Sequence, residues 1–88
     1  EYAQAAKRVR DSGFDAVEIH GGHSYLLNQF LSPYYNRRSD AYGGSPANRY
    51  RIVGDIIAAI RQAAGPHFPI WIKITCSDFF EGGLTFED

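Results

Sequence analysis

The sequence predicts an α/β fold with parallel strands, because helical and strand patterns alternate along its 88 residues. Apolar residues recur at helical spacing in residues 2–9 and 52–64, and each stretch precedes a run typical of a strand, residues 15–20 and 69–75. A helix between two strands makes them parallel neighbours. Two parallel strands leave both sheet edges unpaired, so we expect the remaining strands from further chain or from other copies. The natural parent is a TIM (β/α)8 barrel of roughly 250 residues, of which residues 1–88 form about two β/α units as a partial domain. A doubly wound sheet is the alternative architecture.

The first predicted helix presents Tyr2, Ala5, Ala6 and Val9 on one face. It ends at Ser12-Gly13, where glycine can take the left-handed conformation. In residues 15–20, apolar and polar side chains alternate in part and some are β-branched, and the run stops at Gly21-Gly22. This pattern predicts the first strand.

A short helical segment follows this strand and opens a long loop. Leu26, Leu27, Phe30 and Leu31 give one or two helical turns, which Ser32-Pro33 ends. Residues 33–47 show no periodicity, and a loop of this length in a compact domain is typically a binding or catalytic loop.

The second long helix begins at Pro46 or Asn48 and ends at Gly65-Pro66. Its apolar stripe consists of Ile52, Val53, Ile56, Ile57, Ile60 and Ala63 or Ala64. Its polar residues, expected to face water, are Arg49, Arg51, Asp55, Arg61 and Gln62.

The last part of the chain contains the second predicted strand, a turn and the approach to a further helix. The strand covers residues 69–75, and we expect the outer faces of Trp71 and Ile72 to lack partners. Glu81-Gly82-Gly83 forms the turn, and Thr85 is the expected N-cap of the helix that would follow.

Composition excludes several functional classes. A 44% hydrophobic chain with 15% aromatic residues is too apolar for a disordered tail, and a net charge of −1 favours neither nucleic acid nor an anionic membrane. The single Cys76 excludes an intramolecular disulfide, and no signal peptide or membrane span is visible, so a cytoplasmic location is expected. The chain has no Met, which suggests a processed or excised segment.

The charge distribution is less even than the total. Residues 37–51 contain four arginines, Arg37, Arg38, Arg49 and Arg51, against one acid, Asp40. Ion pairing within the loop is the simpler interpretation, and a local anion site is the alternative. Gly43-Gly44-Ser45 lacks the Lys-Ser/Thr ending of a phosphate loop and is interpreted as a turn.

Polar side chains are concentrated where the two strands end. His20, His23 and Tyr25 follow the first strand, and Lys73 and Thr75 close the second. Because reacting groups in a β/α barrel sit at the carboxyl ends of the strands, these five are expected to meet at one mouth. Gly21 and Gly22 would leave room there for a flat ligand.

Each of these residues also has a structural interpretation. The two histidines could cap the strand end, and Tyr25 could be a packed aromatic residue at a helix start. A zinc site needs three or four ligands, which this region does not supply, so no metal is expected. Lys73 lies among Ile and Trp, where a cation needs a polar partner.

Four segments are distinctive: residues 13–33 (GFDAVEIHGGHSYLLNQFLSP), 36–45 (NRRSDAYGGS), 48–51 (NRYR) and 78–85 (DFFEGGLT). Together they resemble the Old Yellow Enzyme family of FMN-dependent NAD(P)H:flavin oxidoreductases. The resemblance implies a β/α barrel, of which this chain would be the third helix, fourth strand, fourth helix and fifth strand. It also implies FMN as cofactor, NAD(P)H as reductant and a small activated alkene (enone, enal or nitroalkene) as substrate.

The same resemblance implies roles for individual residues. His20 and His23 match the pair that donates hydrogen bonds to the substrate oxygen, with His20 also beside the cofactor, and Tyr25 matches the proton donor. Lys73 stands where many members have an Arg near the flavin, and a lysine can act there as a point charge without the bidentate fork. The arginines and Asp40 of the loop are expected to hold that loop, with an interface role left open.

Other functions remain open from the sequence. A dienoyl-CoA reductase-like flavin and iron–sulfur oxidoreductase would need cluster cysteines outside these residues. A non-catalytic βαβ scaffold that assembles from several copies belongs to a different class. The remainder of the barrel is the expected partner, and the physiological substrate, the oligomeric state and the role of Cys76 are not determined.

Overall fold

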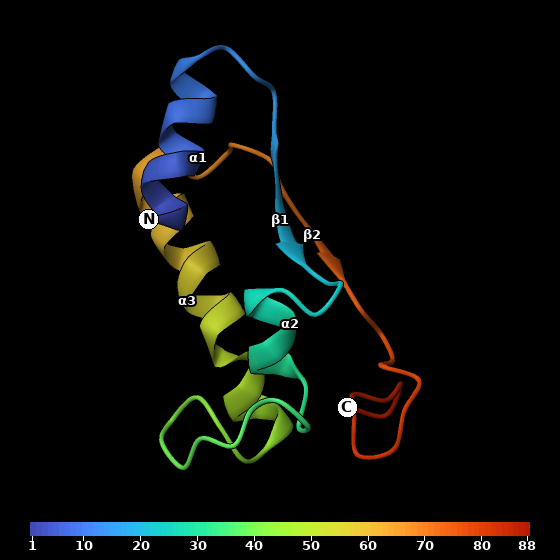
Figure 1. Cartoon of the computed structure of the whole chain (residues 1–88). Helices are drawn as coiled ribbons and strands as arrows, with labels where there is room; N and C mark the ends of the chain where they lie inside the picture. The colour runs from blue at the N-terminus through green and yellow to red at the C-terminus, as the bar shows by residue number, and fades with distance from the viewer.

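The computed structural model describes all 88 residues and contains three helices and two strands. In chain order the elements are α1 (Tyr2–Asp11), β1 (Val17–Gly21), α2 (Leu26–Leu31), α3 (Pro46–Ala64) and β2 (Ile70–Ile74). Figure 1 shows α1 and α3 side by side, with both strands running in the opposite direction to these helices. The predicted order of helix, strand, helix, strand is therefore confirmed, as is the short helical segment after the first strand.

The two strands form a parallel pair, as predicted. Val17 pairs with Ile70 at one end, His20 pairs with Lys73, and Gly21 pairs with Ile74 at the other end. The strands are shorter than the sequence patterns indicated: β1 starts two residues later and includes Gly21, and β2 is one residue shorter at each end. Backbone pairing decides these limits, and Val17 is the first residue whose Cα has a partner in β2.

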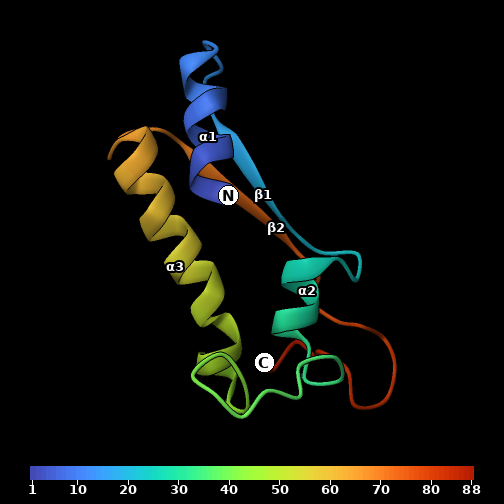
Figure 2. The same cartoon turned by 60° about the vertical axis from the view of Figure 1, so that its left-hand side comes forward.

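One face of the sheet is covered by helices and the other is open. The core consists of Ala6, Ile19, Leu27, Ile56, Ile60, Ala64 and Phe68, with Ile70 and Ile72 packed against it. Figure 2 shows α1 and α3 along one side of the two strands. The expectation that Ile72 lacks partners is therefore wrong, because side chains alternate along a strand and Ile72 points to the helices. Its neighbour Trp71 is 63% exposed, as expected.

The two long helices begin and end where the sequence predicted. Gly13 and Gly65 both have positive φ, at 89° and 99°, and each follows the last helical turn. Ser45 caps α3, since its side chain accepts a hydrogen bond from the Asn48 amide, and Pro46 takes the first helical position.

Two arginines of α3 do not face water, contrary to the sequence prediction. Arg49 is only 4% exposed and Arg61 is half-buried. The Arg49 guanidinium donates to the carbonyl oxygens of Leu31 and Gly44 and pairs with Asp88, and Arg61 donates to the carbonyl of Phe68. These partners satisfy the buried charge, which the helical pattern alone could not show.

The loop between α2 and α3 is held by its own polar groups. Arg38 pairs with Asp40 through its Nη2 at 2.5 Å and keeps the pKa of that carboxyl below its ordinary value. Arg37 donates to the carbonyl of Tyr34, and Arg51 donates to the carbonyl of Ala41. The arginines are bonded within the protein, which supports the loop-holding interpretation over an anion site, although only Arg38 forms an ion pair inside the loop.

The segment after β2 folds back as irregular structure. The turn predicted at Glu81-Gly82-Gly83 is present, with φ of 75° at Gly82. Asp88 accepts from the backbone and side chain of Thr85. This is one half of a capping box, which agrees with Thr85 preceding a helix, but no helix forms within residues 84–88.

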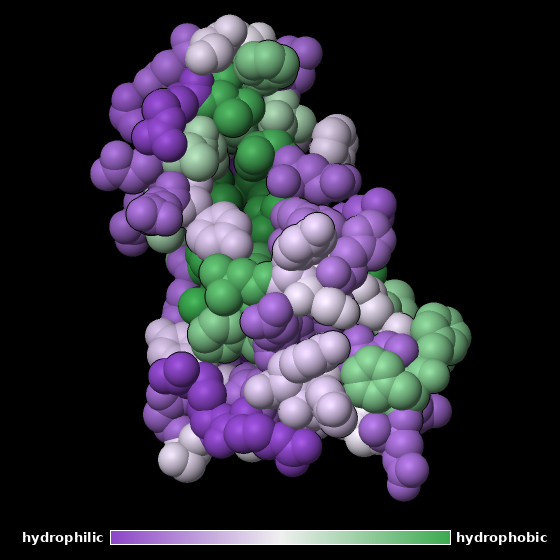
Figure 3. Space-filling model, viewed as in Figure 1, coloured by the Kyte–Doolittle hydropathy of each residue, from purple (hydrophilic) through white to green (hydrophobic).

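Large apolar side chains remain exposed on the chain. Phe79 and Phe86 are 87% and 73% exposed and lie in the C-terminal segment. Figure 3 shows hydrophobic residues on this face between α1 and the strands and again over the C-terminal loop. No helix has the length and apolar character required to span a lipid bilayer. The open sheet face and exposed aromatics agree with the expectation that further strands and helices cover this piece.

Candidate functional site

His20 lies on the open face of the sheet, at the carboxyl end of β1. Side chains alternate along β1, so Ile19 is buried among the helices while Glu18 and His20 point to the opposite face. In the neighbouring strand, Lys73 is the register partner of His20. The imidazole and the ammonium therefore extend from neighbouring positions of the same face.

A tight left-handed turn follows β1 and returns the chain toward His20. His23 and Ser24 have φ of 56° and 59°, a region that residues other than glycine rarely adopt. The turn places the His23 ring 5.3 Å from the His20 ring, measured between centroids. Tyr25 then takes the N-cap position of α2, with its ring centroid 5.5 Å from that of His20.

The three rings form an open cluster. Tyr25 is 64% exposed, and both histidines are exposed. The structure thus brings together His20, His23 and Tyr25, and places Lys73 beside His20, as the sequence predicted. Two N–H-bearing rings next to a phenol can bind an oxygen atom of a small molecule and offer it a proton.

Thr75 lies at this end of the sheet but has a different part from the one expected. Its hydroxyl oxygen accepts a hydrogen bond from the backbone N–H of His23 at 3.1 Å. Thr75 therefore holds the backbone of the turn through this hydrogen bond, and its side chain is not a member of the ring cluster.

Gly21 and Gly22 lie close to β2 and Thr75. A Cβ on Gly21 would lie 3.0 Å from the carbonyl oxygen of Lys73, and a Cβ on Gly22 would lie 3.0 Å from the Thr75 hydroxyl oxygen. Both glycines are buried. They allow the close approach of β2 and Thr75, and the space they would leave for a flat ligand stays a prediction.

Lys73 is exposed and forms no ion pair. Its predicted need for a buried polar partner does not arise in this chain, because nothing covers this face of the sheet. An unpaired cation on an open face, next to His20, can meet an anionic or electron-rich group of a ligand.

Two polar residues next to the cluster, the buried Asn28 and the half-buried Asp78, were not predicted from the sequence. Asn28 is 1% exposed and accepts from the Ser24 N–H, while Asp78 accepts from Asn28, from Ser32 and from the Leu84 N–H. A signal was present, because Asn28 is a polar residue between the apolar positions of a short helix. Such a residue needs hydrogen-bond partners once it is buried.

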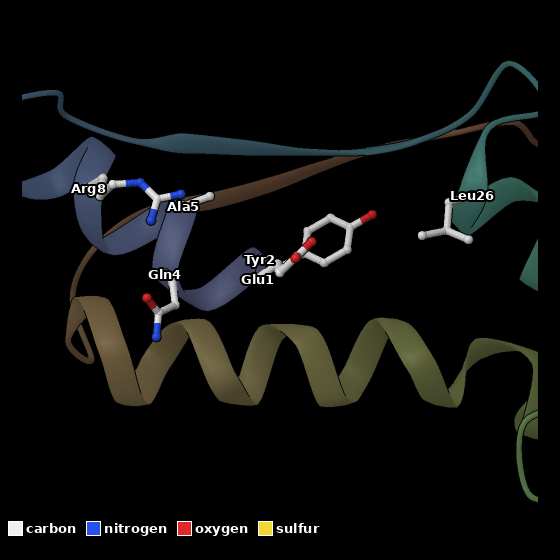
Figure 4. A pocket seen from close by; sticks show the side chains of 6 residues that line it. All are labelled: Glu1, Tyr2, Gln4, Ala5, Arg8 and Leu26. Carbon is white, nitrogen blue, oxygen red and sulfur yellow. The ribbon is translucent and has the colours of Figure 1, made fainter.

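Neither a metal cluster nor the largest hollow coincides with these residues. No group of three or more His, Cys, Asp and Glu side chains comes together. The hollow of about 670 Å³ is an open groove lined by Glu1, Tyr2, Gln4, Ala5, Arg8 and Leu26. Figure 4 shows the Tyr2 ring between α1 and Leu26 in this groove. Cys76 is a free, exposed thiol beyond β2.

A family model and several known proteins match this chain over almost its whole length. A family model described as NADH:flavin oxidoreductase / NADH oxidase matches residues 1–88. An NADPH dehydrogenase of Geobacillus sp. (strain WCH70) is 49% identical over 87 residues, which are 99% of this chain and 25% of that protein. The chain therefore spans about a quarter of the length of the curated relatives it matches.

Solved structures show the same arrangement of helices and strands. 2-Naphthoyl-CoA reductase in complex with 2-naphthoyl-CoA is 35% identical with a TM-score of 0.92, over 98% of this chain and 13% of that one. Morphinone reductase in complex with tetrahydroNAD is 39% identical with a TM-score of 0.75, over 98% of this chain and 23% of that one. The matches confirm the predicted fold class, a fragment of a TIM barrel.

Proposed function

The chain belongs to the NADH:flavin oxidoreductase / NADH oxidase family, which confirms the resemblance to Old Yellow Enzyme, and we propose that it forms part of an FMN-dependent enzyme that reduces activated alkenes with NAD(P)H. The substrates in this proposal are enones, enals and nitroalkenes, which carry an electron-withdrawing oxygen group on the double bond. In the assembled enzyme, the hydride would come from bound FMN reduced by NAD(P)H.

The proposal depends above all on the clustering of three rings. His20 lies at the carboxyl end of β1, and His23 and Tyr25 follow it in the turn and at the N-cap of α2. The ring centroids of His20 and His23 are 5.3 Å apart and those of His20 and Tyr25 are 5.5 Å apart, at the end of the sheet where β/α barrels carry their reacting groups. Negative charge develops on the substrate oxygen as the β-carbon is reduced. Ring N–H groups of His20 and His23 would stabilise that charge more in the transition state than in the ground state, because the charge develops only there.

Tyr25 completes the reduction by donating its phenolic proton to the α-carbon. A phenol is neutral at pH 7 and can act as a general acid, which typically accelerates a reaction about 10²–10⁴-fold. Its position at the N-cap of α2 fixes the backbone from which the ring extends, and the open surroundings leave the hydroxyl accessible to a substrate.

The residues of the open face fit one edge of a flavin. Lys73 is exposed, carries no ion pair and neighbours His20 in the sheet register. A cation at this position would favour an anionic ring edge and would not need to break an existing salt bridge to do so. We assign Lys73 and His20 to the ring side of the FMN site, and the phosphate side to chain beyond these residues.

Substitution of Tyr25 by Phe in the full-length protein tests the proposal. Tyr25→Phe should slow flavin re-oxidation by 2-cyclohexenone by about 10²-fold or more, while flavin reduction by NADPH keeps its wild-type rate. Rapid-mixing absorbance measurements separate the two half-reactions. Tyr34→Phe, which removes the hydroxyl of another exposed tyrosine, is the matched control and should change neither. Equal losses in both half-reactions would refute the assigned role.

A second candidate is a dienoyl-CoA reductase-like flavin and iron–sulfur enzyme. The observation that favours it is the TM-score of 0.92 to 2-naphthoyl-CoA reductase, above that to morphinone reductase. The 49% identity to an NADPH dehydrogenase favours the simple alkene reductase. Iron and acid-labile sulfide in the purified full-length protein, together with faster turnover of an enoyl-CoA than of its free enone, would establish the second candidate.

A further inference from the structure

The turn that delivers His23 and Tyr25 is strained. His23 and Ser24 are consecutive non-glycine residues with φ of 56° and 59°. L-residues persist in this conformation only where surrounding contacts hold them. The contacts around this turn therefore decide where the following side chains lie.

Three hydrogen bonds hold the two strained residues. The His23 N–H donates to the Thr75 hydroxyl oxygen at 3.1 Å, and the Ser24 N–H donates to Asn28 Oδ1 at 3.0 Å. The Ser24 carbonyl accepts from the Gln29 side chain at 2.7 Å. The first of these bonds crosses from β2, so it ties the turn to the strand that carries Lys73.

The surroundings of Asn28 and Thr75 favour two of these hydrogen bonds, those that the two residues accept. Asn28 is 1% exposed, and its Nδ2 is 3.4 Å from Asp78, which also accepts from Ser32 at 2.6 Å. Gly22 has no Cβ at the point where one would lie 3.0 Å from the Thr75 hydroxyl oxygen. An alanine at this position would crowd the hydroxyl that the His23 amide needs.

We propose that Thr75 and Asn28 are positioning residues that hold His23 and Ser24 in the left-handed conformation and thereby set the His23 imidazole and the Tyr25 phenol against His20. The roles of the rings rest on the proposed function, whereas the hold on the turn rests on the hydrogen bonds alone. If the His23 N–H loses its acceptor, the strained residues can relax to negative φ. The chain between His20 and Tyr25 then rotates, and the rings separate.

The test compares Thr75→Val with Thr75→Ser in the full-length, FMN-loaded protein. Valine keeps the shape of threonine but removes the hydroxyl, while serine keeps the hydroxyl and removes only a methyl group. Amide hydrogen exchange over residues 22–25 should become about fivefold faster in Thr75→Val, because a hydrogen bond of ordinary net strength is lost, and should stay at the wild-type rate in Thr75→Ser.

The reaction supplies a second readout. Flavin re-oxidation by 2-cyclohexenone should slow on the order of tenfold to a hundredfold in Thr75→Val, the effect of a small misplacement of reacting groups, while flavin reduction by NADPH is unchanged. Thr75→Ser, which keeps the hydroxyl, should show the wild-type rate of flavin re-oxidation. Gly22→Ala, which crowds the same hydroxyl, is an independent variant and should also accelerate exchange.

The outcomes distinguish this inference from the proposed function. Wild-type exchange in both Thr75→Val and Gly22→Ala would overturn the hold on the turn. Equal defects in Thr75→Val and Thr75→Ser would overturn it as well, since packing of the methyl group would then be responsible. His23→Ala and Tyr25→Phe are measured in parallel: if neither slows re-oxidation, the proposed function fails, and the exchange data still decide whether Thr75 holds the turn.

Discussion

Replacement of Arg49 by Met should destabilise the protein more than the same replacement at an exposed arginine of α3. The Arg49 side chain is almost completely buried, and Nε and Nη1 donate to the carbonyls of Leu31 and Gly44 at 2.7 and 2.8 Å. Its Nη2 pairs with Asp88, whose side chain is 16% exposed. One guanidinium thus joins the end of α2, the loop before α3 and the C-terminal segment.

The expected magnitude follows from the partners that Met leaves behind. Removing one member of a buried ion pair costs about 3–5 kcal/mol, because the remaining charge lacks compensation. Met retains most of the apolar stem, so lost packing adds little. With a slope of roughly 2 °C per kcal/mol for a large domain, the melting temperature of the full-length protein should fall by about 6–10 °C.

The assay is thermal unfolding of the full-length protein at fixed FMN concentration, because a bound ligand also shifts the melting temperature. Arg51→Met is the matched control: Arg51 lies on the same helix, is exposed and donates to the Ala41 carbonyl and to Asn48. It should cost about 1 kcal/mol or less. Equal shifts for the two variants would refute the reasoning.

A double-mutant cycle with Asp88→Asn identifies the source of the cost. If the ion pair carries it, Arg49→Met should destabilise the Asp88→Asn protein by less than it destabilises the wild type. A coupling of zero would assign the loss to the two carbonyls instead.

Further predictions concern two glycines, one carboxylate and the isolated chain. Gly54→Ala should stabilise the full-length protein by about 0.5–1 kcal/mol in denaturant unfolding, because Gly54 lies inside α3 and nothing approaches its would-be Cβ. Gly43→Ala should destabilise it by roughly 1–3 kcal/mol, because the new Cβ would lie 2.2 Å from the Arg38 carbonyl oxygen; equal effects of the two glycine substitutions would contradict this. The pKa of Asp88 is lowered, first by the Thr85 amide and then by the Thr85 hydroxyl and Arg49, against the opposing effect of burial. Its stabilising contribution is therefore present above its unfolded pKa of about 3.9 and is lost as the pH falls through the lower folded pKa, so Asp88→Asn should flatten the acid limb of melting temperature against pH. Residues 1–88 expressed alone should not retain FMN, and flavin absorbance that stays with the chain through gel filtration would disprove this.

Much of the fold could be predicted from local pattern. The apolar stripe of α3 and Gly65 at its end specify the helix, because periodicity and a glycine with positive φ depend on residues within one or two turns. The clustering of His20, His23 and Tyr25 was also predictable, since the strand ends at His20-Gly21 and the carboxyl ends of barrel strands carry such groups.

The contacts that hold these residues were not predictable in the same way. Arg49 fits the polar side of its helix, yet its partners Leu31 and Asp88 are 18 and 39 residues away along the chain. The His23 amide finds its acceptor in Thr75, 52 residues later. None of these three partners can be identified from local periodicity.

By itself, therefore, the sequence determined which segments form helices and strands and which polar side chains reach the carboxyl end of the sheet. Only the tertiary structure decided that Arg49 is buried, that Gly21 and Gly22 admit the neighbouring strand, and that Thr75 fixes the left-handed turn. The physical reason is the distance along the chain over which the interactions act. Secondary structure follows from interactions between residues a few positions apart, whereas burial of a charge or of a strained turn depends on partners that only the folded chain brings within hydrogen-bond distance.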